Sequence, residues 1–168
     1  VSADARLREL VVAGLARRYH DTERTAAASR AERELAVIAG MGFAPYFLAV
    51  VAIADLARAR EIPFLGRGSA ADSLVAYCLG LTDADPIRHG LLFERFLNPA
   101  RGDLPDIDLD FCWRRRDELV DAVYEHFGRD HVARIATFVT CGPRAAYQEA
   151  AKVLGLPVAE AARRSKLL

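Results

Sequence analysis

The chain begins with apolar positions at the spacing of a helix. Within residues 3–19 the apolar side chains recur every three or four positions, so they fall on one stripe of the predicted helix. The members of this stripe are Leu7, Leu10, Val11 and Leu15. The pattern predicts an amphipathic helix with charged residues on its other faces.

Two further helices are expected before residue 61. Ser29 followed by Glu32 is a capping box, which predicts a second helix that begins there and stops near Gly40. Pro45 suits the first turn of a third helix over residues 45–60. Because this third segment is apolar nearly all round, we expect it to be buried.

In the rest of the chain, strand-like segments alternate with helical ones. The order of elements predicts an α/β fold with a mixed sheet and flanking helices. The expected elements are a strand at 62–65, a loop at 66–69, a helix at 70–79, a strand at 106–111, a helix at 114–127 closed by Gly128, a strand at 132–138, and a helix at 143–154 that ends before Gly155.

The segment from Pro105 to Phe111 alternates acidic and apolar residues. In an extended chain, side chains two positions apart share a face, so Asp106, Asp108 and Asp110 are expected to point one way. Neighbouring carboxylates repel one another, and a hard divalent cation such as Mg²⁺ removes that conflict. Two such ions, about 3.5–4 Å apart, can activate a hydroxyl nucleophile and neutralise leaving pyrophosphate.

The acidic segment also resembles two other kinds of structure, a solvated edge strand and a calcium-binding loop. A solvated edge strand with acids on its wet face stays open on the pattern alone. A calcium-binding loop does not fit, because with Asp106 as the first ligand the required glycine falls on Phe111 and the closing glutamate on Asp117.

The loop at residues 66–69 is a candidate anion site. It lies between an expected strand and an expected helix, where backbone N–H groups can surround a phosphate. Gly68 allows close approach, Ser69 can donate a hydrogen bond and Arg67 adds positive charge. It is neither a Walker loop nor a dinucleotide fingerprint. A plain turn with a serine helix cap remains the alternative.

Composition narrows the class of protein. Of the 168 residues, 52% are hydrophobic and 27% charged, which is typical of a globular chain. The longest apolar stretch, residues 43–56, contains Pro45 and Asp55, so we expect no membrane span. Three cysteines without metal-type spacing indicate a reducing compartment. No signal peptide is evident, and the ends suggest a piece of a longer protein.

The formal net charge is zero and by itself gives no hint of nucleic acid. The distribution is uneven, however, since acids gather at 104–111 and basic residues dominate 144–168. Trp113 and Tyr124 are expected to be packing residues and not platforms for stacking bases. The four histidines are scattered, without ligand spacing, and are expected to be structural.

The stretch GRGSAADSLVAYCLGLTDADPIRHGLLFERFLNPARGDLPDIDLDF, residues 66–111, resembles the core motif of the bacterial C-family DNA polymerases. These are the alpha subunits of DNA polymerase III and their error-prone relatives. MGFAPYFLAVV before this stretch, and FGRD, IATF, KVLG and SKL after it, fall in the family's order. The resemblance therefore covers about residues 31–168. The motifs SAADS and PDIDLDF are more similar to the error-prone subgroup, whereas FCWRRRDELV is more similar to the replicative one. The subgroup is therefore left open.

The resemblance implies a nucleotidyltransferase palm similar to that of polymerase beta over residues 1–137, and the helical start of a thumb over 138–168. It assigns a role to each matching residue. Asp106 and Asp108 match the catalytic ligands of two Mg²⁺ ions, with Asp110 as a supporting acid. The nucleotide-binding residues are Gly68, Ser69, Arg67 and Arg95, and Arg144 matches a DNA contact.

The implied activity is template-directed DNA synthesis from deoxynucleoside triphosphates in the bacterial cytoplasm. Its implied partners are primer-template DNA, a sliding clamp and other replisome subunits, with no membrane. The family uses a third catalytic aspartate, expected beyond Leu168, so this chain alone is predicted to be inactive. Another nucleotidyltransferase, or a catalytically silent DNA-binding paralogue, remains an alternative.

Overall fold

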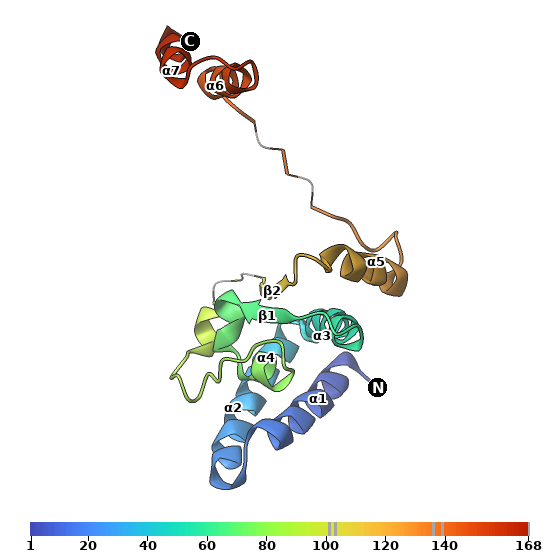
Figure 1. The fold of residues 1–168 in the computed structure, drawn as a ribbon. Coiled ribbons are helices and arrows are strands. Elements are labelled where there is room, and N and C mark those ends of the chain that lie inside the picture. The colour runs from blue at the N-terminus through green and yellow to red at the C-terminus, as the bar shows by residue number, and fades with distance from the viewer. Residues whose placement is uncertain (101, 103, 136, 139, 168) are drawn as a thin grey trace. The chain divides into compact units, whose positions relative to one another are not determined.

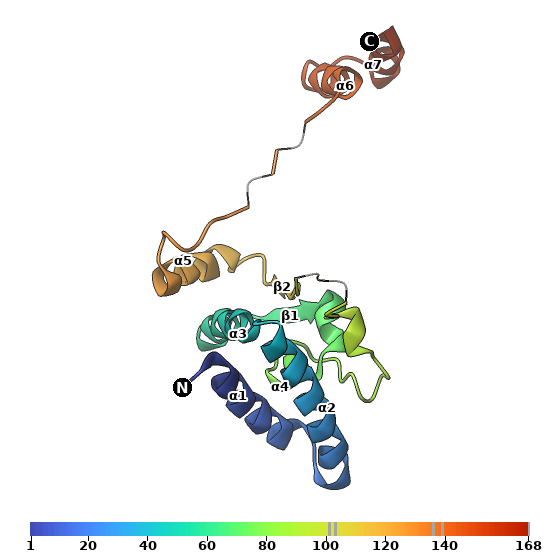
Figure 2. The same ribbon diagram turned by 180° about the vertical axis from the view of Figure 1, so that it is seen from behind.

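The computed structural model describes residues 1–100, 102, 104–135, 137–138 and 140–167, apart from the side chains of residues 21 and 22 (Figures 1 and 2). It divides into two compact units, Val1–Val132 and Ala133–Leu168. The first unit contains the helical core, a small sheet and the acidic segment, and the second contains the last helices.

Three long helices begin the first unit: α1 (Ala3–Arg18), α2 (Asp21–Gly40) and α3 (Ala44–Ala59). The expected first and third helices are thereby confirmed, and Ser2 caps α1 by accepting a hydrogen bond from the Ala5 amide. The expected start of the second helix is wrong. Ser29 lies inside α2, because the preceding residues, rich in alanine with Glu and Arg, are themselves good helix formers.

Apolar stripes of these helices form one core with the short helix α4 (Leu74–Cys78). Helix α1 packs against α2, α3 and α4 (Figure 1). As its composition predicts, α3 is buried along much of its length, with Phe47 fully covered. Burying such a side chain stabilises the fold by roughly 1.5–3 kcal/mol. Other fully or nearly fully buried residues include Leu7, Val11, Ile38, Leu74, Val75 and Leu97.

The sheet has two antiparallel strands, β1 (Phe64–Arg67) and β2 (Asp108–Phe111). Phe64 pairs with Phe111 and Arg67 with Asp108, so these two distant segments lie side by side (Figure 1). Because paired residues share a face, the inner face carries Phe64, Gly66, Leu109 and Phe111, and the outer face carries Leu65, Arg67, Asp108 and Asp110. The two phenylalanine rings lie 5.5 Å apart between centroids.

Both strands are shifted or shortened relative to the prediction, which placed them at 62–65 and 106–111. The expected loop at 66–69 is therefore wrong in part, because its first two residues belong to β1 and its last two to a 3-10 turn, η1 (Gly68–Asp72).

The helix that follows also differs. The expected single helix over residues 70–79 is wrong: η1 comes first, and α4 follows. Ser73 separates them because its backbone is extended and its side chain caps α4. Another 3-10 turn, η2 (Phe93–Arg95), comes later. Helix α5 (Arg116–Phe127) ends at Gly128, whose φ is 86°, as predicted.

The expected strand over 132–138 is wrong. Its described residues form neither helix nor strand, and Ile135 and Phe138 are 94% and 89% exposed. A β-branched apolar run becomes a strand only when another strand offers it hydrogen bonds, and none pairs with the described part of this segment. The fold is therefore mixed α/β, mostly helical, with a single small sheet in the described part of the chain.

The second unit consists of α6 (Pro143–Val153), α7 (Val158–Arg164) and the turn η3 (Ser165–Leu167). Its first helix confirms the prediction over residues 143–154. Ala151 and Ala161 pack in its small interior, and Gln148 Nε2 donates to Ser165 Oγ at 2.9 Å.

Within the described residues, no single helix has the length and apolar character needed to cross a membrane. One bent pair, Glu23–Gly40 with Ala44–Ala59, meets those criteria by length and composition only.

Candidate functional site

The outer face of the sheet brings Arg67 together with two acids. Arg67 Nε donates to Asp110 Oδ2 at 2.9 Å, and its Nη1 lies 3.5 Å from Asp108 Oδ2. The hydrogen bond to Asp110 is the main cause that holds the pKa of Arg67 above its ordinary value, and the charges of Asp110, Asp108 and Asp106 add to it. The three acids therefore lie within electrostatic reach of one guanidinium group.

Gly68 brings the glycine-serine turn against Asp108. Its φ is +72°, in the left-handed region that glycine adopts at little cost. A Cβ atom at this position would lie 2.8 Å from Asp108 Oδ2, so any side chain would displace the carboxylate. Ser69 is exposed and follows directly in η1. The turn and the candidate metal-binding acid are therefore in direct contact.

Gly66, on the inner face, fixes β1 against the core. A Cβ atom here would lie 1.9 Å from the carbonyl oxygen of Leu81, an impossible contact with backbone. The strand that carries Arg67 can therefore approach the loop after α4 only because residue 66 is glycine. The sequence suggested a close approach to phosphate within this loop, whereas at Gly66 the close neighbour is the protein's own backbone.

Asp106 lies just before β2, and its position depends on a helix. The amide of Ile107, the residue between the two candidate aspartates, donates to Tyr46 Oη at 3.1 Å. Tyr46 belongs to α3. Burial is the largest cause that raises the pKa of Tyr46, the Ile107 amide lowers it, and the charges of Asp106 and Asp108 raise it further. Sequence patterns gave no sign of this contact, because the two residues are 61 positions apart.

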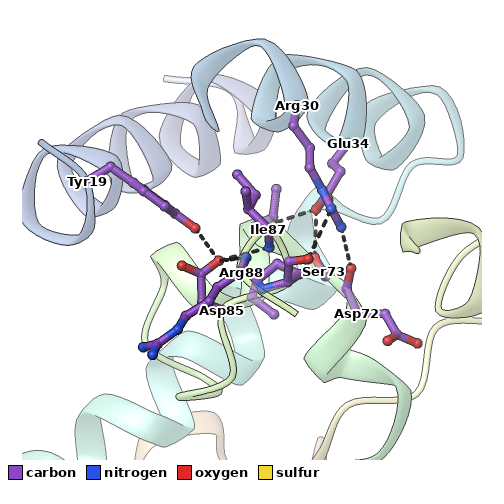
Figure 3. A network of polar contacts seen from close by, with 11 residues as sticks. Tyr19, Arg30, Glu34, Asp72, Ser73, Asp85, Ile87 and Arg88 are labelled. Atoms are coloured by element: carbon purple, nitrogen blue, oxygen red, sulfur yellow. Dashed lines mark hydrogen bonds and ion pairs between the residues drawn. The ribbon is translucent and has the colours of Figure 1, made fainter. Parts of the chain in front are cut away.

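An ion pair between Arg30 and Glu34 of α2 points toward Asp72 and Ser73, at the end of the turn (Figure 3). Glu34, only 2% exposed, accepts hydrogen bonds from Ser73 Oγ and the Val75 amide, both at 3.0 Å. Arg30 donates from Nε to Glu34 at 2.9 Å and from Nη2 to the carbonyl of Asp72 at 2.9 Å. The pair therefore holds the junction between η1 and α4.

This pair was missed in the sequence, although a signal was present. Glu34 stands among the inward positions of α2, beside Leu35 and between Ala31 and Ile38, where a charge is unexpected. A buried acid four residues after an arginine is the pattern of a satisfied internal ion pair.

A second contact in Figure 3 fixes the loop after α4. Tyr19 Oη donates to Asp85 Oδ1 at 2.6 Å, and Asp85 also accepts from the amides of Ile87 and Arg88. Burial first, and the bond to Asp85 second, raise the pKa of Tyr19. The loop whose Leu81 carbonyl supports Gly66 is therefore tied to the end of α1.

The remaining candidates lie in different places. Arg95, in η2, has its Nε 3.7 Å from Oδ2 of the buried Asp72, which places it beside the end of the turn. Arg144 belongs to the second unit, where its Nη2 donates to the Lys166 carbonyl at 3.4 Å. The packing prediction for Trp113 is wrong, since its side chain is 79% exposed. Tyr124 is partly buried, with the Arg129 guanidinium 5.3 Å from its ring centroid.

The carboxylates near the turn are candidate ligands for a metal ion. Asp106 and Asp108 offer carboxylate oxygens, the hard ligands that Mg²⁺ prefers. Among the residues that the structure describes, no group of three or more His, Cys, Asp or Glu side chains is arranged to hold a metal ion. The candidate centre in this chain is thus a pair of carboxylates beside a glycine turn and a nearby arginine.

Comparison with known proteins gives the family. Residues 5–168 match the model of the bacterial DNA polymerase III alpha NTPase domain. The chain is 45% identical over 163 residues to DNA polymerase III subunit alpha of Borreliella burgdorferi. The aligned region covers 96% of this chain and 14% of that relative. It is 48% identical over 157 residues to the error-prone DNA polymerase of Symbiobacterium thermophilum, covering 93% of this chain and 14% of the relative.

The chain thus spans about one seventh of the length of these curated relatives. The match reaches from α1 to η3 and includes both sheet strands and the glycine-serine turn. Replicative and error-prone enzymes are similar to it to about the same degree. The chain belongs to the family of bacterial DNA polymerase III alpha subunits, which includes the error-prone DNA polymerases.

Proposed function

We propose that this chain is part of the palm of a DNA-directed DNA polymerase, with its thumb beginning in the second unit. The observation that carries the proposal is the contact of Asp108 with Gly68, which joins an acidic strand to a turn suited to phosphate. Asp106 and Asp108 would hold two Mg²⁺ ions, which supply activation of the primer 3′-hydroxyl and charge neutralisation at the triphosphate.

The chain's own residues would bind and orient the nucleotide. Gly68 and Ser69 are exposed, and Gly68 lies against Asp108. The backbone of the turn and the Ser69 hydroxyl would donate to phosphate oxygens. Arg67, 60% exposed, and Arg95, 73% exposed, would add positive charge on the two sides of the turn. Asp110 supports the site by holding Arg67 next to Asp108.

Partners follow from the same proposal. The residues from 138 onward would be the start of the thumb, with Arg144 contacting the phosphate backbone of primer-template DNA. A sliding clamp and other replisome subunits would bind elsewhere in a full-length protein. The relatives are bacterial DNA polymerases, and we propose the cytoplasm as the site of action.

Primer extension by the full-length polymerase that carries this segment tests the function. Asp108→Asn should abolish incorporation of a deoxynucleotide while leaving affinity for primed DNA unchanged, because the amide keeps the shape but loses the charge that holds the cation. Glu118→Gln, a change in an exposed acid of α5, is the control. Normal incorporation by Asp108→Asn would refute the proposal, and a wild-type protein that binds DNA without extending it would identify a silent paralogue.

A further inference from the structure

The amide between the two candidate aspartates has its partner outside the sheet. Pairing of β1 with β2 ends at Arg67 opposite Asp108, and Gly68 then turns its chain away with φ +72°. The chain before Asp108 therefore leaves the ladder. The Ile107 amide, in a partly buried position, is satisfied by Tyr46 Oη at 3.1 Å instead.

We propose that Tyr46 is a positioning residue for the metal-binding pair, in that it fixes Asp106 relative to Asp108. The proposal rests on the proposed function of those two aspartates. A peptide unit is planar, so holding the N–H of Ile107 also orients the peptide plane that joins it to Asp106. Asp108 is placed by its strand partner, whereas Asp106 is exposed and lies outside β2. Strand pairing thus fixes the backbone at Asp108, and Tyr46 fixes the backbone next to Asp106.

The tyrosine is itself held firmly. Its ring meets that of Phe47 edge to face, with centroids 6.1 Å apart and an interplanar angle of 85°. Phe47 is fully buried and packs in the same manner on Phe96. Tyr46 is itself partly buried against this core, so its hydroxyl is held at the edge of the core.

The Tyr46 hydroxyl can also donate a hydrogen bond while it accepts the one from Ile107. A tyrosine oxygen that accepts a hydrogen bond keeps its own proton to donate. The charges of Asp106 and Asp108 both act on the hydroxyl of Tyr46, so the acids lie near it. The hydroxyl would therefore donate a hydrogen bond to one of these carboxylates, which is how outer-sphere partners orient metal ligands.

Tyr46→Phe in the full-length polymerase is the test, with Tyr124→Phe as the matched control. Both changes remove one hydroxyl, and Tyr124 lies on α5, with the Arg129 guanidinium over its ring. Primer extension is measured across a Mg²⁺ titration and again with Mn²⁺. For Tyr46→Phe we expect kcat to fall and the half-saturating Mg²⁺ concentration to rise about 10-fold. The KM for the nucleotide should stay at the wild-type value, and Mn²⁺, which binds more tightly, should restore part of the rate.

Each outcome has a distinct meaning. A Tyr46→Phe enzyme with wild-type Mg²⁺ dependence overturns the positioning role, even if its melting temperature and total activity fall, because then the hydroxyl serves stability alone. If Asp108→Asn in parallel still extends primers, the proposed function itself fails. Loss of extension by Asp108→Asn together with a shifted Mg²⁺ dependence of Tyr46→Phe supports both.

Discussion

Glu34→Ala is the change that should most weaken the first unit without touching its outer surface. It removes a carboxylate that accepts three hydrogen bonds, from Arg30 Nε, Ser73 Oγ and the Val75 amide, at 2.9, 3.0 and 3.0 Å. Hydrogen bonds to charged groups contribute about 1.5–3 kcal/mol each, but these three share one acceptor and cannot simply be added. Arg30, only 18% exposed, would also lose its ion-pair partner. Breaking a buried pair in this way costs about 3–5 kcal/mol.

Urea unfolding followed by far-ultraviolet circular dichroism measures the loss. The matched control is Glu32→Ala on the same helix, whose ion pair with Arg8 joins two side chains that are each 51% exposed. An exposed pair contributes about 0–1 kcal/mol, so this variant should unfold near the wild-type midpoint. Glu34→Gln keeps the shape and one oxygen acceptor and should lie between the two. If Glu34→Ala and Glu32→Ala lose equal stability, the burial argument is wrong.

Three further changes probe the glycines and the buried thiol. Gly66→Ala should destabilise the chain by about 1–3 kcal/mol or more, since its Cβ would strike backbone, whereas Gly40→Ala, with open space around it, should be neutral or stabilising in thermal melts. Gly68→Ala should reduce primer extension more than Gly90→Ala, although both have positive φ, because only at residue 68 does a carboxylate occupy the space of the new methyl group. Burial raises the pKa of Cys78 to about 12. The unfolded chain then loses this proton first, so stability should fall as pH rises from about 9 toward 12, and Cys78→Ala should flatten that slope in urea titrations at stepped pH.

The sequence predicted those parts of the fold that depend on neighbours along the chain. Helices with clear stripes or end signals, such as α1, α3 and α6, occur where the pattern placed them. The alternation of acids also indicated correctly that Asp108 and Asp110 share a face, since this follows from strand geometry alone.

The parts that could not be predicted depend on contacts between distant residues. Ser73 interrupts the expected helix because a glutamate 39 positions earlier accepts its hydroxyl. The segment 132–138 has strand composition, yet no strand pairs with its described residues. Gly66 looked like part of a phosphate loop, and its close contact with Leu81 shows only in three dimensions.

The candidate site also depends on contacts between residues that are distant in the sequence. The candidate catalytic and nucleotide-binding residues lie within residues 66–111. Their positions are fixed by contacts with residues of α2 and α3 and with the loop after α4. Arg30 and Glu34 hold the end of the turn. Tyr46 holds the peptide between Asp106 and Ile107, and the Leu81 carbonyl limits residue 66 to glycine. Helices α2 and α3 therefore help to position the candidate site residues. The residues that make these contacts all lie within the range that matches the family model, residues 5–168.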